Sequence, residues 1–420
     1  MNSDRTWWTN KRVLITGIVG FVGSHLGKYL ASQDADVYGL VRTVADGDVT
    51  QRAVTRNVEG FAHILTGDLL DPASLIKAID ESQPDVIFHL AAQSFVPYSL
   101  QRPSETYDVN FTGTLNLLEA VRVRKIFPTI VFAGSSEEYG LVFATQKQYE
   151  SYTASHGPVF PAPDSIPELP VKETNPLRPM SPYAVAKVGA DHMMRNYTLC
   201  WGIPTIVSRA FNTEGADRGG VLVTSTIARQ ATQLVRGEVD RKIVIGNVNP
   251  FRDWSHVQDI VRGYGLLAEH GAPAGVYNQG SQRTNSVLSY LLLALQEVGA
   301  RPHRIESFRN GKVVEDPLAP DWEPVWGSTF EKTKIDSIML SGELSFELED
   351  EGLWAHTDIG RIAIHFDADR FRPSELPILL ADTTKITQLG FEVGHSLSDI
   401  VHEQVAHHMD ADSIQGREAG

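Results

Sequence analysis

A tyrosine and a lysine stand four residues apart in "SPYAVAK" (181–187), a segment whose Ser181 and Pro182 predict the start of a helix. On a helix this spacing puts Tyr183 and Lys187 on one face, one turn apart. A lysine ammonium beside a phenol favours the phenolate, so we expect the phenol pKa to fall below its usual value of about 10. Such a phenolate can take the proton of a hydroxyl group while hydride leaves the same carbon.

A second reactive stretch, "AGSSEEYG" (133–140), follows the apolar run "PTIVF", which predicts a buried strand. A carboxylate at the end of a strand can serve as a general acid and base, and a neighbouring hydroxyl can hold a substrate oxygen. The alternative is that the carboxylate only caps a turn. The side chains concerned are Ser135, Ser136, Glu137 and Glu138, of which we expect Glu138 to face away from the site.

Alternating strand and helix patterns predict the elements that position these groups. The strands are rich in Val and Ile and apolar on both faces, as in a parallel sheet covered by helices on two sides. We therefore predict an α/β fold: a Rossmann-type, doubly wound parallel sheet. The predicted strands are "RVLITG" (12–17), "DVYGLV" (36–41), "AHILTG" (62–67), "DVIFHLAA" (85–92), "PTIVFAG" (128–134) and "PTIVSRAF" (204–211), with "GVYNQG" (275–280) as a candidate for a last strand.

A glycine-rich turn, "TGIVGFVG", joins the first strand to the first helix. In this context Gly17 permits a tight turn, Gly20 lets a pyrophosphate approach the backbone, and Gly23 lets the helix pack closely on the sheet. The helix N-terminus, with Phe21 and Val22, then faces the phosphates. The pattern predicts a dinucleotide cofactor; tight packing without a ligand is the alternative.

The end of the second strand bears on the choice of cofactor. A carboxylate there would hold the ribose 2′-hydroxyl of NAD, whereas this chain has Arg42 and no acid before Asp46. An arginine at this edge favours NADP over NAD, which is the other possible cofactor. Alternatively, Arg42 is an ordinary surface cation without a role in binding.

Residues after the third and fourth strands are further candidates for cofactor contact. Asp68, followed by Leu69, would lie near the adenine, although a turn-capping role for Asp68 is a fair rival. After the fourth strand, the small side chains of Ala91 and Ala92, next to Leu90, would let the chain pass under the cofactor.

Beyond residue 212 the alternation weakens, which indicates a smaller mixed α/β domain in the C-terminal part that binds the substrate. Two segments resemble insertions: one rich in Pro, Ser and Tyr, and one that carries the acidic run "ELSFELEDEG". The predicted cofactor domain comprises 1–212 and 247–285 with the insertion 141–178, and the substrate domain comprises 213–246 and 286–410 with the insertion 307–368.

Composition excludes several classes of protein. The formal charge of −15 argues against binding to nucleic acid or anionic membranes, both of which need a basic face. No apolar run is long enough for a transmembrane helix, and the N-terminus lacks a signal core. The single cysteine, Cys200, fits the reducing cytoplasm, and the histidines show no metal-ligand spacing, so we expect no metal site.

Taken together, the segments "HLAAQS", "DVNFTGTLNLLEAVR" and "SPYAVAK" and the glycine turn resemble the extended short-chain dehydrogenase/reductase superfamily. Within it, the chain is most similar to the GDP-mannose 4,6-dehydratases. The segments that carry this likeness are "AAQSFVPYS", "SSEEYG", "NPLRPMSPYAVAK", "SRAFNTEG", "GNVNPFRDWSHVQDIVRGY" and "RFRPSELPILLADTTK".

The resemblance implies catalytic roles for Ser135, Glu137, Tyr183 and Lys187, and contact of Tyr183 and Lys187 with the nicotinamide cofactor. Tyr183 would accept the proton of the sugar 4-hydroxyl near Ser135 as hydride passes from carbon 4 to NADP. Glu137 would remove the proton on carbon 5 and protonate the departing 6-hydroxyl. Hydride would return to carbon 6, which yields a 4-keto-6-deoxy sugar. Asn110 matches the asparagine that supports the lysine.

For the nucleotide sugar, the resemblance implies contacts from Ser94, Ser136, Asn212, Arg252, Arg372 and Glu375. Arginine forks suit phosphate oxygens, and a carboxylate can accept from guanine N–H groups. One departure concerns the helix after "GG", where the GDP-mannose enzymes usually carry Arg-Lys and this chain has Ser225 and Thr226. Losing that cation could cost about 1–3 kcal/mol of binding unless another replaces it.

Two alternative functions stay open. An epimerase or decarboxylase acting on another nucleotide sugar would share the Tyr–Lys pair without needing Glu137 as an acid and base. A catalytically silent protein that binds the cofactor would typically lack Tyr183 or Lys187, and both are present. The resemblance also implies a homodimer or homotetramer.

Overall fold

Parallel pairing builds the main sheet of the protein. The computed structural model describes residues 6–42, 57–371 and 375–410. Within these residues, a seven-stranded sheet has the order β11-β6-β5-β4-β1-β2-β3, and every neighbouring pair is parallel. The strands are β1 (Arg12–Thr16), β2 (Asp36–Val41), β3 (His63–Thr66), β4 (Val86–His89), β5 (Thr129–Ala133), β6 (Thr205–Ala210) and β11 (Val276–Gln279).

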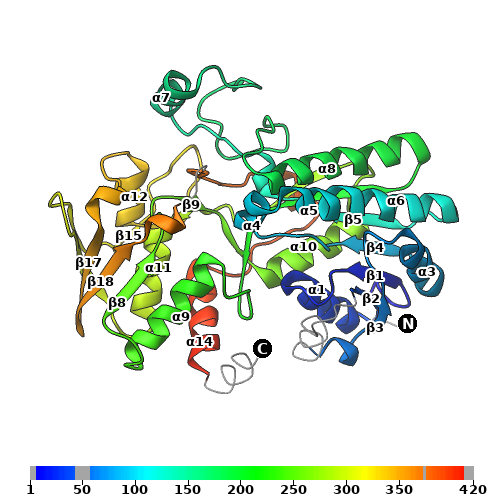
Figure 1. Cartoon of the computed structure of the whole chain (residues 1–420), viewed down its shortest axis with the longest axis horizontal. Helices are drawn as coiled ribbons and strands as arrows, with labels where there is room; N and C mark the ends of the chain where they lie inside the picture. The colour runs from blue at the N-terminus through cyan, green and yellow to red at the C-terminus, as the bar shows by residue number, and fades with distance from the viewer. Residues whose placement is uncertain (1–5, 43–56, 372–374, 411–420) are drawn as a thin grey trace.

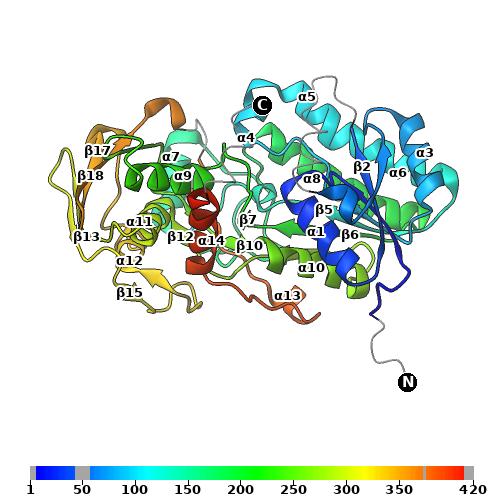
Figure 2. The ribbon, with the colours of Figure 1, turned by 90° about the horizontal axis from the view of Figure 1, so that it is seen from below.

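Helices cover both faces of this sheet, as Figures 1 and 2 show. One face packs against α3 (Pro72–Ser82), α6 (Gly113–Arg124) and α8 (Pro182–Trp201), and the other packs against α1 (Phe21–Ser32) and α10 (Val257–His270). Because both faces are covered, a strand such as β4 is buried at every position. The predicted doubly wound α/β fold is confirmed, including the last strand.

A second, mixed sheet lies in the C-terminal half, at the other end of the molecule in Figure 1. In the described part of the chain it has the order β14-β13-β17-β18-β8, antiparallel except for the β18–β8 pair. Its strands are β8 (Lys242–Ile245), β13 (Pro302–Ser307), β14 (Val313–Glu315), β17 (Gly352–Thr357) and β18 (Gly360–Phe366). The hairpin β17–β18 comes from 307–368, so this segment forms the middle of the sheet.

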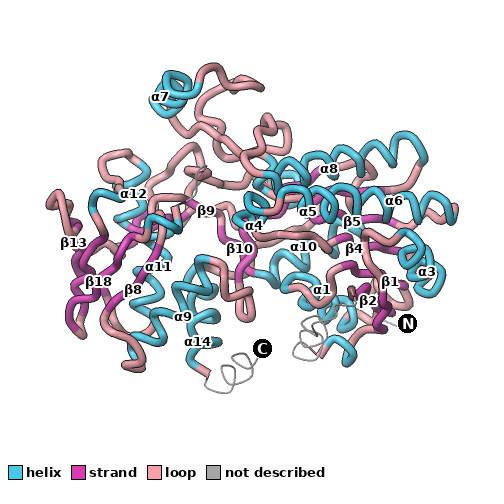
Figure 3. The backbone as a smooth tube through the Cα atoms, viewed as in Figure 1, coloured by secondary structure: helices cyan, strands magenta, loops and turns pink. Residues whose placement is uncertain are grey.

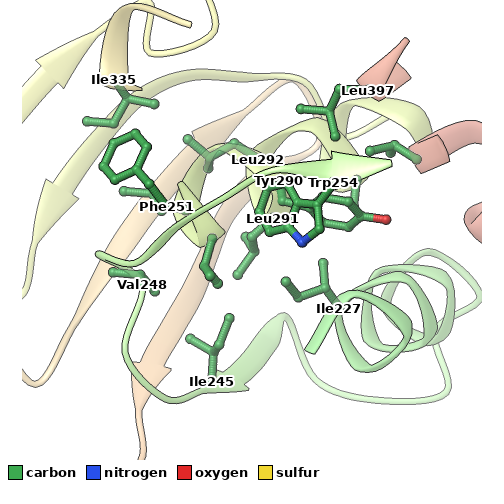
Figure 4. Packing of buried hydrophobic residues seen from close by; sticks show 14 of the residues in the cluster. Ile227, Ile245, Val248, Phe251, Trp254, Tyr290, Leu291, Leu292, Ile335 and Leu397 are labelled. Atoms are coloured by element: carbon green, nitrogen blue, oxygen red, sulfur yellow. The ribbon is translucent and has the colours of Figure 1, made fainter. Parts of the chain in front are cut away.

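Three helices pack together beside the second sheet: α9 (Val223–Val235), α11 (Val287–Glu297) and α14 (Leu397–Met409). Their apolar faces share one buried cluster with the strands, part of which Figure 4 shows. Trp254 and Tyr290 meet edge to face in it, with ring centroids 4.8 Å apart. This apolar burial anchors α14 near the C-terminus.

Short strand pairs and helices lie in the connections within and between the two sheets, and Figure 3 shows how much of the connecting chain is loop. The strand pairs are β7 (Asn212–Glu214) with β10 (Trp254–His256), β9 (Phe251–Arg252) with β12 (Asn285–Ser286), and β15 (Pro320–Asp321) with β16 (Lys332–Thr333). The short helices are α4 (Val96–Gln101), α5 (Pro103–Tyr107), α12 (Lys334–Leu340) and α13 (Thr384–Thr387).

The segment 141–178 leaves the body of the protein and contains α7 (Gln146–His156), a helix that the sequence patterns did not predict. None of the α7 residues is buried. The segment is tied down near its end, where the buried side chain of Arg178 pairs with Glu168 at 2.8 Å and donates to the carbonyl of Leu141 at 2.7 Å.

Neither membrane-spanning helices nor metal-ligand clusters occur among the residues that the structure describes. No helix there is both long and apolar enough to cross a bilayer. No group of three or more His, Cys, Asp or Glu side chains is arranged to hold a metal ion in those ranges.

Candidate active site

The glycine turn between β1 and α1 can exist only with small residues. Gly17 has a φ of +75°, and a Cβ on it would lie 2.8 Å from the backbone nitrogen of Ala91. A Cβ on Gly23 would lie 2.2 Å from the carbonyl oxygen of Gly17. Gly20 is the N-cap of α1 and offers no side chain to the first N–H groups of the helix, which include those of Phe21 and Val22. These donors therefore suit an anion such as a pyrophosphate, so the residues fit a dinucleotide.

The end of β4 lies against this turn. The N–H of Ala91 donates to the hydroxyl of Thr16 at 3.1 Å, and the N–H of Leu90 donates to the Thr16 carbonyl at 3.3 Å. Ala92 follows, half-buried, and Ser94 is exposed in the loop before α4. The predicted cofactor residues of β1 and β4 are thus side by side, as the carboxyl ends of adjacent parallel strands must be.

Two other predicted cofactor residues lie at the ends of β2 and β3. Arg42 is exposed at the end of β2. Asp68 uses one carboxylate oxygen to accept from the N–H of Leu70 at 2.9 Å. Its side chain therefore caps this turn, as the alternative interpretation of the sequence held. Leu69 is buried, 2.8 Å from where a Cβ on Gly113 would lie. Asp46 lies outside the described residues.

Tyr183 and Lys187 occupy the first turns of α8, which Ser181 caps by accepting from the N–H of Ala184 at 3.1 Å. Both side chains are buried, and the Lys187 ammonium lies 5.9 Å from the centre of the Tyr183 ring. The ammonium donates to the carbonyl of Ala133, at the end of β5, at 2.6 Å. The predicted shared face is therefore present, and it is aimed at the end of β5.

The predicted fall in the pKa of Tyr183 is wrong for this structure. Burial raises the pKa of the phenol well above its usual range, and the nearby charges of Glu137 and Glu138 add to the rise. A hydrogen bond with Ser135 opposes it. The Lys187 ammonium is engaged with Ala133 instead, and burial lowers the pKa of Lys187 to about 8. The proton on Tyr183 is therefore held more tightly than that of a free phenol.

The second reactive stretch forms a short 3₁₀ turn, η3 (Ser136–Glu138), directly after β5. Ser135 caps it, because its hydroxyl accepts from the N–H of Glu137 at 3.2 Å. The same Ser135 hydroxyl hydrogen-bonds with the Tyr183 phenol, and the negative charge of Glu137 raises the pKa of that phenol. The phenol on α8 and the hydroxyl of Ser135 are thus within hydrogen-bonding reach, and Glu137 lies two residues further along the same turn. Ser136 is nearly buried, at 3% exposure.

Asn110 matches the asparagine of the family pattern. It belongs to a π-helical turn, η2 (Asp108–Thr112), that leads into α6. Its side chain is buried and clamps the backbone of Gln93, accepting from the N–H at 2.8 Å and donating to the carbonyl at 2.9 Å. Asn110 therefore fixes the loop between β4 and α4.

At the expected nucleotide end, Arg252 and Glu375 meet in an ion pair at 2.7 Å. Arg252 is 7% exposed and also donates to the carbonyl of Leu376 at 2.7 Å. Arg372 lies outside the described residues. Asn212 is half-buried in β7, whose partner β10 lies between the two sheets in Figure 2.

The hydroxyls that replace the expected Arg-Lys pair hold a loop rather than a ligand. Ser225 donates to the carbonyl of Arg218 at 2.8 Å, and Thr226 donates to that of Gly220 at 3.1 Å. The loop itself brings a cation that sequence reasoning missed: Arg218, paired with Glu214 at 2.7 Å. The signal was an arginine beside two glycines, six residues after Asn212.

Known proteins share this fold and these sequence features. The profile of the NAD dependent epimerase/dehydratase family matches residues 13–280. The chain belongs to this family. The enzyme is 31% identical to the GDP-mannose 4,6-dehydratase of Yersinia enterocolitica over 94% of its own length and 93% of that protein. It is 26% identical to the human GDP-mannose 4,6 dehydratase over 93% of this chain and 90% of that one. The resemblance inferred from the sequence is confirmed.

Solved structures agree on the fold. A UDP-glucose 4-epimerase of Thermus thermophilus in complex with NAD gives a TM-score of 0.66 at 20% identity, covering 95% of the enzyme and 99% of that chain. The RMD protein of Pseudomonas aeruginosa complexed with NADPH gives 0.64 at 22% identity, with the same coverage. A dTDP-glucose 4,6-dehydratase of Bacillus anthracis in complex with NAD gives 0.65 at 19% identity, covering 97% and 98%.

Proposed function

We propose that the enzyme is a nucleotide-sugar 4,6-dehydratase that acts on GDP-mannose or a close GDP-sugar. The observation that carries the proposal is the hydrogen bond between Tyr183 and Ser135 on the turn that carries Glu137, at the end of a strand two places from β1 in the sheet. An epimerase needs the phenol and the hydroxyl but no acid between them and the far end of the sugar. Glu137 is therefore the feature that favours dehydration, in keeping with the dehydratases among its relatives.

The residues divide the work of the reaction. In its ionised form, which the hydrogen bond with Ser135 favours, Tyr183 takes the proton of the sugar 4-hydroxyl, and carbon 4 becomes a ketone. The ketone acidifies the proton on carbon 5, which Glu137 removes, and Glu137 then protonates the 6-hydroxyl so that it departs as water. Tyr183 returns a proton to carbon 5. A bound nicotinamide cofactor would supply the internal hydride transfer from carbon 4 to carbon 6.

We propose NADP as the cofactor, with the glycine turn at its pyrophosphate. Arg42 would meet the 2′-phosphate, while Asp68, Leu69, Leu90, Ala91 and Ala92 would line its adenosine and nicotinamide halves. A guanidinium at the end of β2 attracts a 2′-phosphate, but unlike a carboxylate it cannot accept the hydrogen bond that the 2′-hydroxyl of NAD would donate. Titration of the protein with NADPH and NADH, followed by the change in cofactor fluorescence, tests this choice; tighter binding of NADH would reverse it.

The nucleotide sugar is proposed to lie between the two predicted domains, 1–212 with 247–285 and 213–246 with 286–410. Arg252 and Arg218 would neutralise its diphosphate, so Arg218 would compensate for the missing Arg-Lys pair. Ser94, Ser136, Asn212, Arg372 and Glu375 complete the proposed contacts.

A direct assay tests the function. Purified enzyme is mixed with GDP-mannose and, in parallel, with UDP- and dTDP-hexoses, and the product is read by the absorbance of the 4-keto sugar in alkali. We expect a product from GDP-mannose with no added cofactor consumed, because hydride returns to the sugar. A Glu137→Gln variant should oxidise and re-reduce carbon 4 without losing water. No 4-keto product from any nucleotide hexose would refute the proposal.

We also propose that the enzyme works in the cytoplasm as a homodimer or homotetramer. Exposed apolar side chains gather on α6, on α8 and just beyond them, at Val123, Phe127, Val185, Leu199 and Trp201. Adjacent helices with such side chains suit a helical interface between two copies. Light scattering on the eluted protein gives the mass of the assembly, and a monomer at micromolar concentration would contradict this proposal.

A further inference from the structure

The carboxyl group of Glu138, one residue beyond Glu137, lies wholly inside the protein at 0% exposure. Its Oε1 accepts from the N–H of Ser135 at 2.8 Å. A Cβ on Gly134 would lie 2.6 Å from this oxygen, so the glycine leaves the space that the carboxyl fills. The expectation that Glu138 faces away from the sugar agrees with this burial, yet the side chain holds the backbone of the catalytic turn.

The other oxygen of Glu138 faces a buried ion pair. Oε2 lies 3.2 Å from Nε of Arg209, on β6. Arg209 donates to Oδ2 of Asp191 from Nε at 2.9 Å and from Nη2 at 2.7 Å. Arg195 donates to the remaining oxygen of Asp191 at 2.7 Å. Asp191 is one helical turn beyond Lys187 on α8, so this cluster joins the turn after β5 to the helix that carries Tyr183.

The charge balance of the cluster favours a proton on Glu138. Guanidinium groups balance the charge of Asp191 on both of its oxygens. Oε2 of Glu138 and Oδ2 of Asp191 both lie against Nε of Arg209, at 3.2 Å and 2.9 Å, and two carboxyl oxygens brought together in this way can hydrogen-bond to each other only when one of them carries a proton. Burial, reinforced by the charge of Asp191, raises the pKa of Glu138 to about 8, although Arg209 opposes the rise.

Every packed element contributes a charged or titratable group to the surroundings of Glu138. These groups are Asp191, Lys187 and Tyr183 from α8, Arg209 from β6, and Tyr139 from the end of the turn. The charge of an ionised Glu138 would raise the pKa of Lys187 and that of Tyr183. The protonation state of Glu138 therefore affects the pKa values of both Tyr183 and Lys187.

We propose that Glu138 is a positioning residue for the dehydration and acts in its protonated form. One oxygen accepts from the N–H of Ser135, and the other donates to Asp191. Ser135 and Glu137 on the turn and Tyr183 and Lys187 on α8 then share one buried anchor, which fixes the distance between the hydroxyl, the carboxylate and the phenol. The inference rests on the proposed function, because the groups it positions are those that the dehydration uses.

Two variants test the role. Glu138→Gln keeps a neutral acceptor and donor, and at about pH 6.5 it should retain at least about a third of the wild-type kcat. Glu138→Leu removes both contacts and should lower kcat at least about 30-fold with KM changed less than about threefold, since small misplacements of reacting groups are costly. Between about pH 6.5 and pH 9, the ratio of the kcat of Glu138→Gln to that of the wild type should rise at least about threefold. The reason is that the side chain at position 138 ionises over this pH range in the wild type and cannot ionise in the variant.

A matched control is Asp336, another buried carboxylate in a capping box, at the start of α12 in the second sheet region. Asp336→Asn should lower the melting temperature without any change of its kcat ratio with pH. Wild-type kcat in Glu138→Leu would overturn the positioning role, as would a Glu138→Gln variant as slow as Glu138→Leu. A ratio constant with pH would overturn the protonated form, and this measurement decides alone if Glu138→Leu does not fold. Failure of the proposed function looks different: the wild type itself would form no 4-keto product.

Discussion

At the scale of single residues, the proposed chemistry depends on a phenol whose proton is hard to remove. Tyr183 is buried beside Glu137, and both facts raise its pKa. Lys187 lies on the same face of the helix but spends its hydrogen bond on Ala133. The hydrogen bond with Ser135 is thus the contact that most favours proton release.

Tyr183→Phe should lower kcat about 10²–10⁴-fold, since the general base is lost. Cofactor affinity and melting temperature should stay close to wild type, because the ring still packs. A matched control is Tyr197→Phe on the same helix, whose hydroxyl bonds Glu119 away from the turn, and which should leave kcat within about twofold. Turnover by Tyr183→Phe equal to that of the control would rule out the assigned role.

The raised pKa of Glu138 also predicts how stability depends on pH. A carboxyl with a pKa of about 8 in the folded protein and 4.5 when unfolded binds more protons in the folded state. Its contribution to stability is therefore complete below about pH 4.5 and is lost as pH rises towards 8.

We expect the free energy of unfolding of the wild type to fall relative to that of Glu138→Gln between about pH 5 and pH 7.5. Urea unfolding of both proteins across that window measures the difference. A difference that does not change with pH would show that Glu138 is ionised throughout.

At the scale of elements, the turn between β1 and α1 shows how backbone shape can leave N–H donors for an anion. Gly17 requires a left-handed backbone and approaches Ala91, while Gly23 approaches Gly17. The first N–H groups of α1 are left for an anion because Gly20 offers no capping side chain. The site is thus built from main chain, and its requirement is the lack of side chains.

Gly17→Ala should weaken NADPH binding at least about tenfold, because its Cβ must push Ala91 and the end of β4 away from the turn. Gly299→Ala is the matched control: Gly299 has a similar φ of +83°, and nothing lies within 4 Å of where its Cβ would be. Both variants should lose stability from backbone strain, whereas only Gly17→Ala should lose affinity in a fluorescence titration. Equal affinities would contradict a cofactor site at this turn.

At the scale of the whole molecule, contacts between distant segments form the region where we propose that the nucleotide binds. Arg252 on β9 and Glu375, which precedes α13, are 123 residues apart and form one ion pair. The second sheet and its helices hold both segments in place through the largest buried cluster. In the proposed complex, the diphosphate would lie at Arg252 and the sugar at the turn after β5.

Arg252→Gln should raise KM for GDP-mannose about tenfold or more while kcat changes little, because a diphosphate contact holds substrate and transition state equally. The control is Arg309, an exposed arginine that pairs with Glu351 in the region of the second sheet. Arg309→Gln should leave both kcat and KM unchanged. A fall in kcat without a change in KM would contradict a contact with the nucleotide and would instead indicate that Arg252 acts on the reacting sugar.

Several features of the fold and site were predictable from local sequence. The strands of the main sheet, the glycine turn and the shared face of Tyr183 and Lys187 follow from periodicities and from φ requirements that act over a few residues. The helix α7 was not predictable, because its apolar side chains are few and none of its residues is buried. The ion pair of Arg252 with Glu375 was missed because its partners are far apart in sequence.

By itself, the sequence determined which groups could react, since residue type and short-range spacing set their chemistry and the ends of the strands that carry them. Only the tertiary structure decided their states. The pKa values of Tyr183, Lys187 and Glu138 are set by burial and by charges that arrive from other elements. Desolvation and Coulomb forces act through space, so no pattern along the chain records them.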